Sequence, residues 1–205
     1  MATQQPQPTP PPSPRDDIIH VPDPRLKRKS ARVGHIDHST ETLARHMIAA
    51  TLDWEETREH EFGAALAAVQ LGQNYRVVVI RNDFEDKAEK SFGVFVNPEI
   101  VKKSDEKIVV WDACLSFLTI FMQVERHREI VVRYQDLHGE WHEVEAGAER
   151  DLSELLQHEI DHLDGILAVD RITDIRTMCT REEFEKRYRA RSPYASVGES
   201  ETAGS

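Results

Sequence analysis

The sequence predicts an α+β domain, in which short strands lie mostly between a first helix and a central helix. Two stretches, 39–52 and 152–163, carry apolar residues at helical spacing. Most of the short apolar runs that match strands lie between these two stretches. Because strands and helices do not alternate along the chain, a doubly wound α/β fold is not expected.

The first half of the chain supplies one helix and two strands. The run 75–80 is short and β-branched, which is typical of a buried strand. The run 93–100 is expected as a second strand that is closed by Asn97-Pro98, because proline interrupts a strand ladder. The helix over 39–52 is expected because its apolar residues fall on one face. These apolar residues are Leu43, Met47, Ile48 and Leu52.

The second half supplies a hairpin and two helices. The runs 129–134 and 139–146 flank a turn sequence and predict an antiparallel hairpin. The stretch 152–163 predicts the central helix, because its leucines and its isoleucine share one side. A last helix is expected over about 181–190. The aromatic residues expected to dock this last helix on the domain are Phe184 and Tyr188.

The two ends differ in composition from the middle of the chain. Six of the ten prolines fall within the first fourteen residues, so 1–17 is expected as a disordered, proline-rich tail. The stretch 192–205 is rich in Ser, Gly, Glu and Ala and is expected as a second disordered tail. A single domain is therefore expected over 18–191, without an internal linker or repeat.

Composition and charge exclude several classes of protein. Lys and Arg number 26 against 37 Asp and Glu, a net charge of −11 that argues against general nucleic-acid binding. No apolar run reaches the ~20 residues that span a bilayer, so no membrane association is expected. The N-terminus lacks the basic and apolar regions of a secretory signal. Two cysteines are too few for a disulfide scaffold, and we expect a cytoplasmic protein.

The strongest functional motif is the nonapeptide QHEIDHLDG at 157–165. His158 and His162 are four residues apart, so on a helix they share a face and can bind one metal ion. Glu159 stands beside the first ligand, where a carboxylate can act as general base toward a metal-activated water. Chance spacing of two surface histidines is the alternative, which the intact nonapeptide disfavours.

A hydrolytic metal site needs a third protein ligand and one open position. Cys114, in the sequence WDACLS, is the leading candidate. Alone, it would be interpreted as a small core residue, but the histidine pair favours a ligand. Cys179 lies in a polar stretch beyond the metal helix and is expected to be structural. A zinc endopeptidase would take its third ligand downstream, where nothing distinguishes the available Glu182, Glu183 and Glu185.

Together these motifs resemble the peptide deformylase family, metal hydrolases that remove the N-formyl group from nascent polypeptides. The family motifs GxGxAAxQ, EGCLS and QHExDHLxG have counterparts, in the same order, at 63–72, 112–116 and 157–165. The resemblance covers about residues 18–175 and implies that 18–191 is a catalytic domain. It also implies antiparallel β-sheets arranged around a central metal-binding helix.

The resemblance assigns roles to single residues. It implies one divalent ion, usually Fe²⁺ in this family, with Zn²⁺, Ni²⁺ or Co²⁺ as substitutes. Glu159 would be the general base that takes the proton of the water that the metal activates, and an N-formylated peptide would be the substrate. The backbone N–H of Leu115 and the side-chain amide of Gln70 would stabilise the oxyanion. The implied metal ligands are Cys114, His158 and His162.

The chain departs from the family pattern near the expected substrate site. A methyl group at Ala65, where the family has glycine, is expected to narrow this site. Asp112, in place of the family's glutamate, is expected to pair with Arg126 as a shortened version of an acid–arginine pair. The departing residues are Ala65, Val69, Asp112, Ala113 and Leu118.

These departures leave more than one function open. The retained ligands and base favour a working hydrolase of formyl-methionyl peptides. The alternatives are a divergent paralogue acting on a small, non-ribosomal N-formyl substrate and a non-catalytic metal-binding homologue. The apolar segment 117–122 is either a buried strand edge or part of an altered substrate site. The basic segment 25–32 either contacts the ribosome weakly or forms a solvated loop, which is the favoured interpretation.

Overall fold

The described residues form two antiparallel sheets and three α-helices, which confirms the predicted α+β class. None of the helices in the described part of the chain is long and apolar enough to cross a membrane. The predicted tail 192–205 lies outside the described residues. The computed structural model describes residues 13–58, 61, 63–83, 86, 88–148 and 151–188.

The larger sheet has five strands in the order β1-β2-β3-β6-β7, and every neighbouring pair is antiparallel. Its last two strands form the predicted hairpin, and β2 is the predicted β-branched strand. The short strand β1 was not predicted, because three residues are too few to show a periodicity. The strands are β1 (Ala65–Ala67), β2 (Val77–Arg81), β3 (Phe92–Lys103), β6 (Glu129–Gln135) and β7 (Trp141–Gly147).

The smaller sheet has three strands in the order β4-β5-β8. It consists of β4 (Lys107–Ala113), β5 (Ile120–His127) and β8 (Cys179–Thr180). The predicted apolar segment 117–122 enters this sheet, where Phe121 and Met122 are buried in β5. That part of the segment is a buried strand, whereas Leu118 before it remains 45% exposed.

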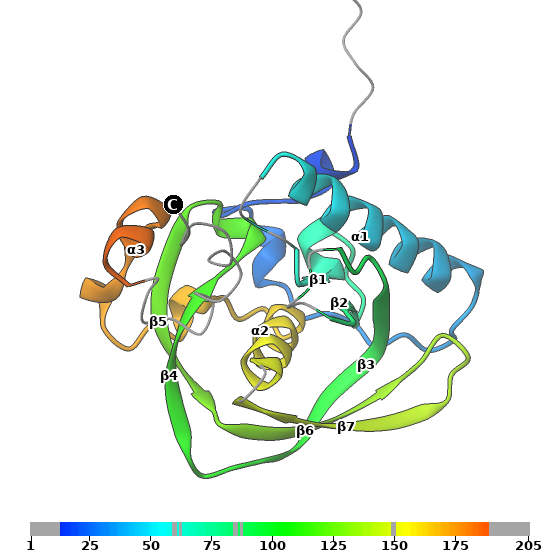
Figure 1. The fold of residues 1–205 in the computed structure, drawn as a ribbon. Helices are drawn as coiled ribbons and strands as arrows, with labels where there is room; N and C mark the ends of the chain where they lie inside the picture. The colour runs from blue at the N-terminus through cyan, green and yellow to red at the C-terminus, as the bar shows by residue number, and fades with distance from the viewer. Residues whose placement is uncertain are drawn as a thin grey trace, which may run out of the picture.

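The central helix lies between the two sheets, as Figure 1 shows. It is α2 (Leu152–Leu163), and it matches the predicted stretch. Helix α1 (His38–Glu56) covers the outer side of β1 and β2, and α3 (Arg181–Arg187) lies beside the smaller sheet (Figure 1). Ten of the twelve residues of α2 are buried, so the helix is a core element with almost no solvent-facing side.

Strand β2 is buried on both faces because a helix covers each side. Val77 and Val79 join the apolar cluster that contains Met47 of α1. Val78 and Ile80 point to the opposite side, into the cluster that contains the apolar residues of α2. This arrangement explains why β2 has a continuous apolar run instead of alternating apolar and polar residues.

Strand β3 continues through the predicted break at Asn97-Pro98. Asn97 has φ of 55°, a left-handed conformation that asparagine tolerates better than most residues, and the pairing register with β6 shifts between Val96 and Glu99. The Asn97 side chain accepts from the N–H of Val33 at 2.8 Å and donates to its carbonyl at 3.0 Å. The bulge thus absorbs the proline without ending the strand.

The folded domain begins before the predicted boundary between tail and domain. Residues Pro14–Asp17 form a short 3₁₀ helix, which the prediction had included in the tail 1–17. Asp53 of α1 accepts hydrogen bonds from the Ser13 hydroxyl and, at 3.0 Å, from the backbone N–H of Arg15. A polar side chain on α1 therefore anchors a segment whose composition alone predicted disorder, while residues 1–12 lie outside the described part.

The last helix docks on the smaller sheet through aromatic residues, as predicted. Phe184 is 4% exposed and stacks on Phe121 with ring centroids 4.3 Å apart. Tyr188 lies against Trp111 of β4, with ring centroids 4.7 Å apart. The described part of α3 is therefore attached to the domain through its aromatic face.

Replacing Gly165 by alanine tests how closely the end of α2 packs. Gly165 has φ of 75°, and a Cβ atom would lie 2.5 Å from the Lys27 carbonyl oxygen. Gly139 has φ of 83° with open space around it, so it serves as a matched control. We expect Gly165→Ala to lower the free energy of unfolding in urea by about 3 kcal/mol and Gly139→Ala by about 1 kcal/mol. Equal losses would show that the packing is not close.

Candidate metal centre

The metal centre is built on one buried side of α2. His158 and His162 lie one turn apart and are 8% and 1% exposed. Their Nε2 atoms are 3.1 Å apart, so both rings point to the same place. The helix ends at Leu163, and two residues later the backbone N–H of Gly165 donates to the His162 carbonyl at 3.1 Å. The sequence-predicted histidine pair is thus brought together on a fixed helix.

Cys114 completes the site from the smaller sheet. It follows β4 directly, and its Sγ atom lies 3.2 Å from Nε2 of His162. Cys114, His158 and His162 offer three ligand atoms that all lie within 4.8 Å of one another, and all three residues are buried. Ligands of one tetrahedral ion are typically about 3.3–3.6 Å apart, so this thiolate and imidazole set fits a divalent transition metal.

Asp112 orients the candidate ligand His158 by contacting the ring nitrogen on the side away from the metal site. Its Oδ1 lies 2.8 Å from Nδ1 of His158, which leaves Nε2 for the metal. Arg126 of β5 contacts the other carboxylate oxygen at 2.7 Å, so the predicted Asp112–Arg126 pair is present. Burial opposes the charge on Asp112, but His158 and Arg126 outweigh burial and hold its pKa well below the ordinary value. This carboxylate therefore stays ionised inside the protein.

Asp161 extends this ion pair into a buried network, a role that the sequence analysis did not assign. It contacts the second Nη of Arg126 and also accepts from Nε and Nη2 of Arg171, at 3.0 and 2.6 Å. Arg126 is 3% exposed and so joins two carboxylates, one from β4 and one from α2. The sequence signal for Asp161 was its place inside the nonapeptide, between the two histidines.

Glu159 is buried on the same helix. It is 3% exposed, and its Oε2 has no hydrogen-bond partner among the described residues. Burial raises the pKa of Glu159 to about 7. A carboxyl group with such a pKa can both accept and release a proton near neutral pH.

Gln70 reaches the centre from a short 3₁₀ helix over Ala68–Leu71. Its Oε1 accepts from the backbone N–H of Ala67 at 2.8 Å, which fixes the orientation of the amide. Its Nε2 then faces Sγ of Cys114 at 3.6 Å and Oγ of Ser116 at 3.2 Å. The NH₂ group of Gln70 therefore faces the segment Cys114–Ser116, which includes Leu115.

A second buried arginine fixes the start of the first motif. Nε of Arg81 donates to the Gly63 carbonyl at 3.2 Å, and Glu55 contacts Arg81 and accepts from the Gly63 N–H at 3.2 Å. A Cβ atom at Gly63 would lie 2.2 Å from Thr51 of α1. Both the N–H and the carbonyl of Gly63, just before β1, are therefore hydrogen-bonded to buried side chains.

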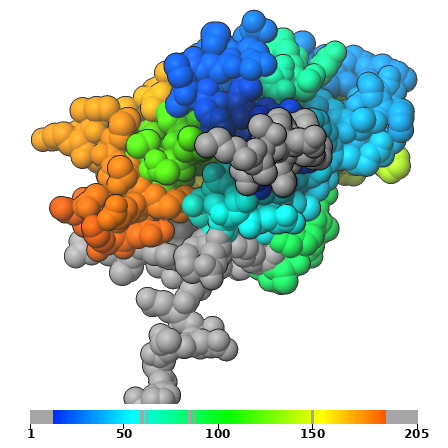
Figure 2. All heavy atoms as spheres, turned by 90° about the horizontal axis from the view of Figure 1, so that it is seen from above, coloured from blue at the N-terminus to red at the C-terminus, as the bar shows by residue number. Residues whose placement is uncertain are grey.

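The N-terminal segment connects the first two motifs. The N–H of Ile19 donates to the Gln70 carbonyl at 2.8 Å, and the N–H of Val21 donates to the Ser116 carbonyl at 3.1 Å. Figure 2 shows this N-terminal part, in blue, on the surface between α1 and α3. The segments that contain Gln70 and Ser116 are far apart in the sequence, and the N-terminal segment fixes them relative to each other.

The departures from the family pattern lie in different surroundings. Ala65 and Val69 are 3% and 1% exposed and pack in the apolar cluster beside α2. Leu118 lies at the surface with φ of 57°, an uncommon conformation for leucine. Cys179 lies in β8 and is not one of the three residues that converge on the candidate site.

A family model for polypeptide deformylases matches residues 15–178. The chain belongs to the polypeptide deformylase family. The peptide deformylase of Bartonella tribocorum is 37% identical over 186 residues, which cover 90% of this chain and 99% of that protein. As a family member, the chain is a metal-dependent hydrolase that removes N-formyl groups from peptides.

Solved structures of the family have the same fold. The Thermotoga maritima peptide deformylase superposes with a TM-score of 0.65 at 31% identity, over 77% of this chain and 97% of that chain. The Synechococcus elongatus enzyme, in complex with actinonin, gives a TM-score of 0.69 at 28% identity, over 82% and 85% of the two chains. The expected fold of sheets around a metal-binding helix is therefore confirmed.

Replacing Asp112 by asparagine tests whether this carboxylate holds His158 for the metal. We expect the affinity for Zn²⁺, measured by competition with a chromophoric chelator, to fall about 10–100-fold. Asp17→Asn is the matched control, because Asp17 makes a 2.9 Å pair with His46 at the surface, outside both groups of residues that could hold a metal ion. An Asp112→Asn protein with an affinity within twofold of the parent would contradict this role.

Proposed function

We propose that the chain hydrolyses the formyl amide of formyl-methionyl peptides at the site formed by Cys114, His158 and His162. The convergence of these three buried ligands next to Glu159 is the observation that carries the proposal. A divalent ion held by these residues would polarise the formyl carbonyl and lower the pKa of a water molecule. The residues around the ligands then have to transfer the proton of this water and stabilise the oxyanion that forms on the formyl carbon.

We assign the proton transfer to Glu159. Its buried carboxylate takes a proton from the attacking water and passes it to the amine that leaves, so formate and a free N-terminus are produced. The pKa of about 7 supports both halves of this task, since neither the charged nor the neutral form is strongly favoured. Burial also keeps bulk water from competing for the proton.

We assign the stabilisation of the oxyanion to Gln70 and Leu115. The Gln70 amide has its oxygen tied to the Ala67 N–H, so its NH₂ group faces the ligand Cys114 without needing to reorient. Leu115 follows Cys114 at the start of a 3₁₀ helix, where its backbone N–H is a candidate donor. A preorganised donor contributes more to the transition state than one that must turn first.

We propose Fe²⁺ as the physiological ion and the cytoplasm as the location. A mixed site of one thiolate and two imidazoles suits Fe²⁺ as well as Zn²⁺, Ni²⁺ and Co²⁺. Both cysteines are free, and Cys114 can bind a metal only while it is reduced. Metal analysis of protein purified without oxygen tests the identity of the ion, and zinc as the major metal would contradict Fe²⁺.

A ribosome contact through the basic segment 25–32 would be weak. Several of its charges are already paired within the protein, at Arg25 with Asp23, Lys27 with Asp170 and Arg32 with Glu99. Arg28 and Lys29 are exposed and remain for an external partner. Two charges give a small electrostatic contribution compared with the roughly 6–10 phosphate contacts of a strong nucleic-acid binder.

The exposed Leu118 supports a second candidate, a preference for an altered substrate. It lies four residues after the ligand Cys114 and replaces a family proline. Rates of formate release from formyl-Met-Ala-Ser and from a panel of small N-formyl compounds separate the two candidates. Efficient turnover of the peptide alone would exclude a non-peptide substrate, and no release from any compound would indicate a non-catalytic homologue.

Replacing Glu159 by glutamine tests the general base. Because the amide cannot accept the proton, we expect kcat for formyl-Met-Ala-Ser to fall about 10²–10⁴-fold, while the metal content stays the same. Glu182→Gln, at an exposed position on α3, is the control and should keep the parental rate. A Glu159→Gln enzyme that works at the parental rate would show that the base is another group.

Replacing Gln70 by glutamate tests the oxyanion donor with little change in shape. The carboxylate can still accept from the Ala67 N–H but offers no donor, so kcat is expected to fall about 10²–10³-fold at unchanged metal content. Gln73→Glu adds the same charge at an exposed position nearby and should change kcat less than twofold. Equal effects of the two substitutions would indicate a general effect of charge.

A further inference from the structure

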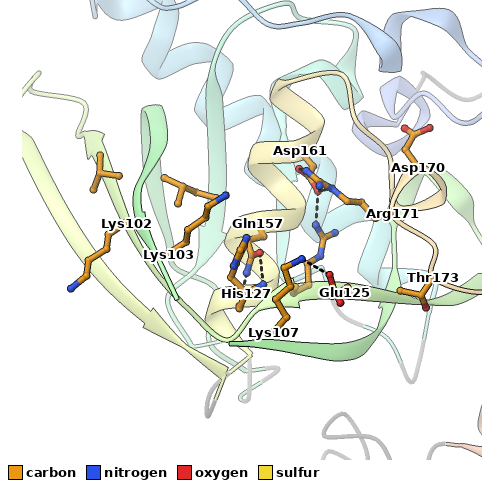
Figure 3. Close-up of a pocket in the computed structure, with 13 residues that line it drawn as sticks. Lys102, Lys103, Lys107, Glu125, His127, Gln157, Asp161, Asp170, Arg171 and Thr173 are labelled. Atoms are coloured by element: carbon orange, nitrogen blue, oxygen red, sulfur yellow. Dashed lines mark hydrogen bonds and ion pairs between the residues drawn. The ribbon is translucent and has the colours of Figure 1, made fainter. Parts of the chain in front are cut away.

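A cavity lies on a different side of α2 from the candidate metal ligands and is not lined by them. It has a volume of about 660 Å³ and lies between α2 and the ends of β3, β4 and β5. Gln157 and Asp161 of α2 line it, whereas the ligands His158 and His162 do not. Figure 3 shows these lining side chains around the opening. This size is within the range of pockets that hold small molecules, roughly 300–1,000 Å³.

The lining carries more positive than negative charge, on a protein whose net charge is −11. Each of its three carboxylates is already paired with a cation: Glu125 with Lys107, Asp161 with Arg126 and Arg171, and Asp170 with Lys27. The lining lysines without a recorded ion pair in the described chain are Lys102 and Lys103.

Several donors remain for a ligand in this cavity. Asp161 takes Nε and Nη2 of Arg171, which leaves Nη1 of that guanidinium. Lys103 extends toward α2 in Figure 3, and Lys102 lies at the rim and points outward. The cavity thus combines a guanidinium nitrogen that remains available with one unpaired ammonium group, while a second ammonium group lies at the rim.

The polar floor of the cavity is rigid. The Gln157 side chain accepts from the His127 N–H at 2.9 Å and donates to the His127 carbonyl at 2.9 Å. The His127 ring nitrogen Nδ1 contacts the Ser104 carbonyl at 2.7 Å. Because these groups already bond to one another, the floor does not need to rearrange to accept a ligand.

We propose that this cavity binds a phosphoryl group, either as free phosphate or on a small organic molecule. A phosphate carries about two negative charges near neutral pH, which are attracted by Lys103 inside the cavity and by Lys102 at its rim. Its oxygens suit the fork of Arg171. The concave shape fits a small ligand better than an extended nucleic-acid strand, and the acidic surface elsewhere disfavours such a strand.

The experiment is calorimetric titration of the metal-loaded full chain with inorganic phosphate and, separately, with glycerol 3-phosphate. Chloride keeps the ionic strength constant. The test variant is Lys102→Gln/Lys103→Gln. The matched control is Arg28→Gln/Lys29→Gln, which removes the same charge at exposed positions outside the cavity. Neither double variant changes a metal ligand or the proposed base.

We expect saturable binding of one equivalent, weakened at least about tenfold in the Lys102/Lys103 variant and less than twofold in the control. Tighter binding of glycerol 3-phosphate than of phosphate identifies an organic phosphate as the ligand class, and equal binding identifies free phosphate. Absence of saturable binding would overturn the proposal. So would equal weakening in both variants, or unchanged binding in the Lys102/Lys103 variant, as expected for an anion bound at the metal.

Discussion

The buried guanidinium of Arg126 is the interaction on which the site depends. It neutralises Asp112 from β4 and Asp161 from α2, and it is almost completely removed from water. Burying three charges is costly unless each is well paired, so removal of one would leave uncompensated charges inside the protein. Because Asp112 also holds His158, the same arginine couples the packing of the smaller sheet on α2 to the orientation of a metal ligand.

Arg81 has a corresponding task in the larger sheet. With Glu55 it holds both backbone groups of Gly63, ahead of the strand that leads to Gln70. Each of the first two motifs is therefore positioned by a buried arginine, Arg81 for the first and Arg126 for the second. The backbone bonds of Ile19 and Val21 then connect the two motifs. Gln70 and Cys114, the proposed oxyanion donor and the candidate ligand, are thus held relative to each other by the contacts of Arg81, of Arg126 and of the N-terminal backbone.

The sequence predicted elements and residues that carry a local pattern. The bounds of α2 followed from its apolar spacing, and the candidate metal ligands were chosen from the His158–His162 interval together with Cys114, three residues that the fold brings together. Strand β4 and the part of β5 after Met122 were missed because their residues mix charged and apolar types, whereas the start of β5 lies in the apolar segment for which a buried strand edge was one interpretation. The role of Asp161 could not be predicted, since its partner Arg126 is 35 residues away in the chain and only the fold brings them together. The 3₁₀ helix of Pro14–Asp17 was missed for the same reason, because it depends on Asp53.

The position of α2 in the chain has a consequence for how the protein is made. The helix at the centre of the fold comes after seven of the eight strands in the described part of the chain, so the apolar cluster between α2 and the larger sheet cannot be completed before α2 is made. Cys114 meets His162 only across 48 residues of sequence. Contacts of such long range close late in folding. The cluster between α1 and the larger sheet needs only earlier residues, whereas the cluster around α2 and the candidate metal site both wait for the same late helix.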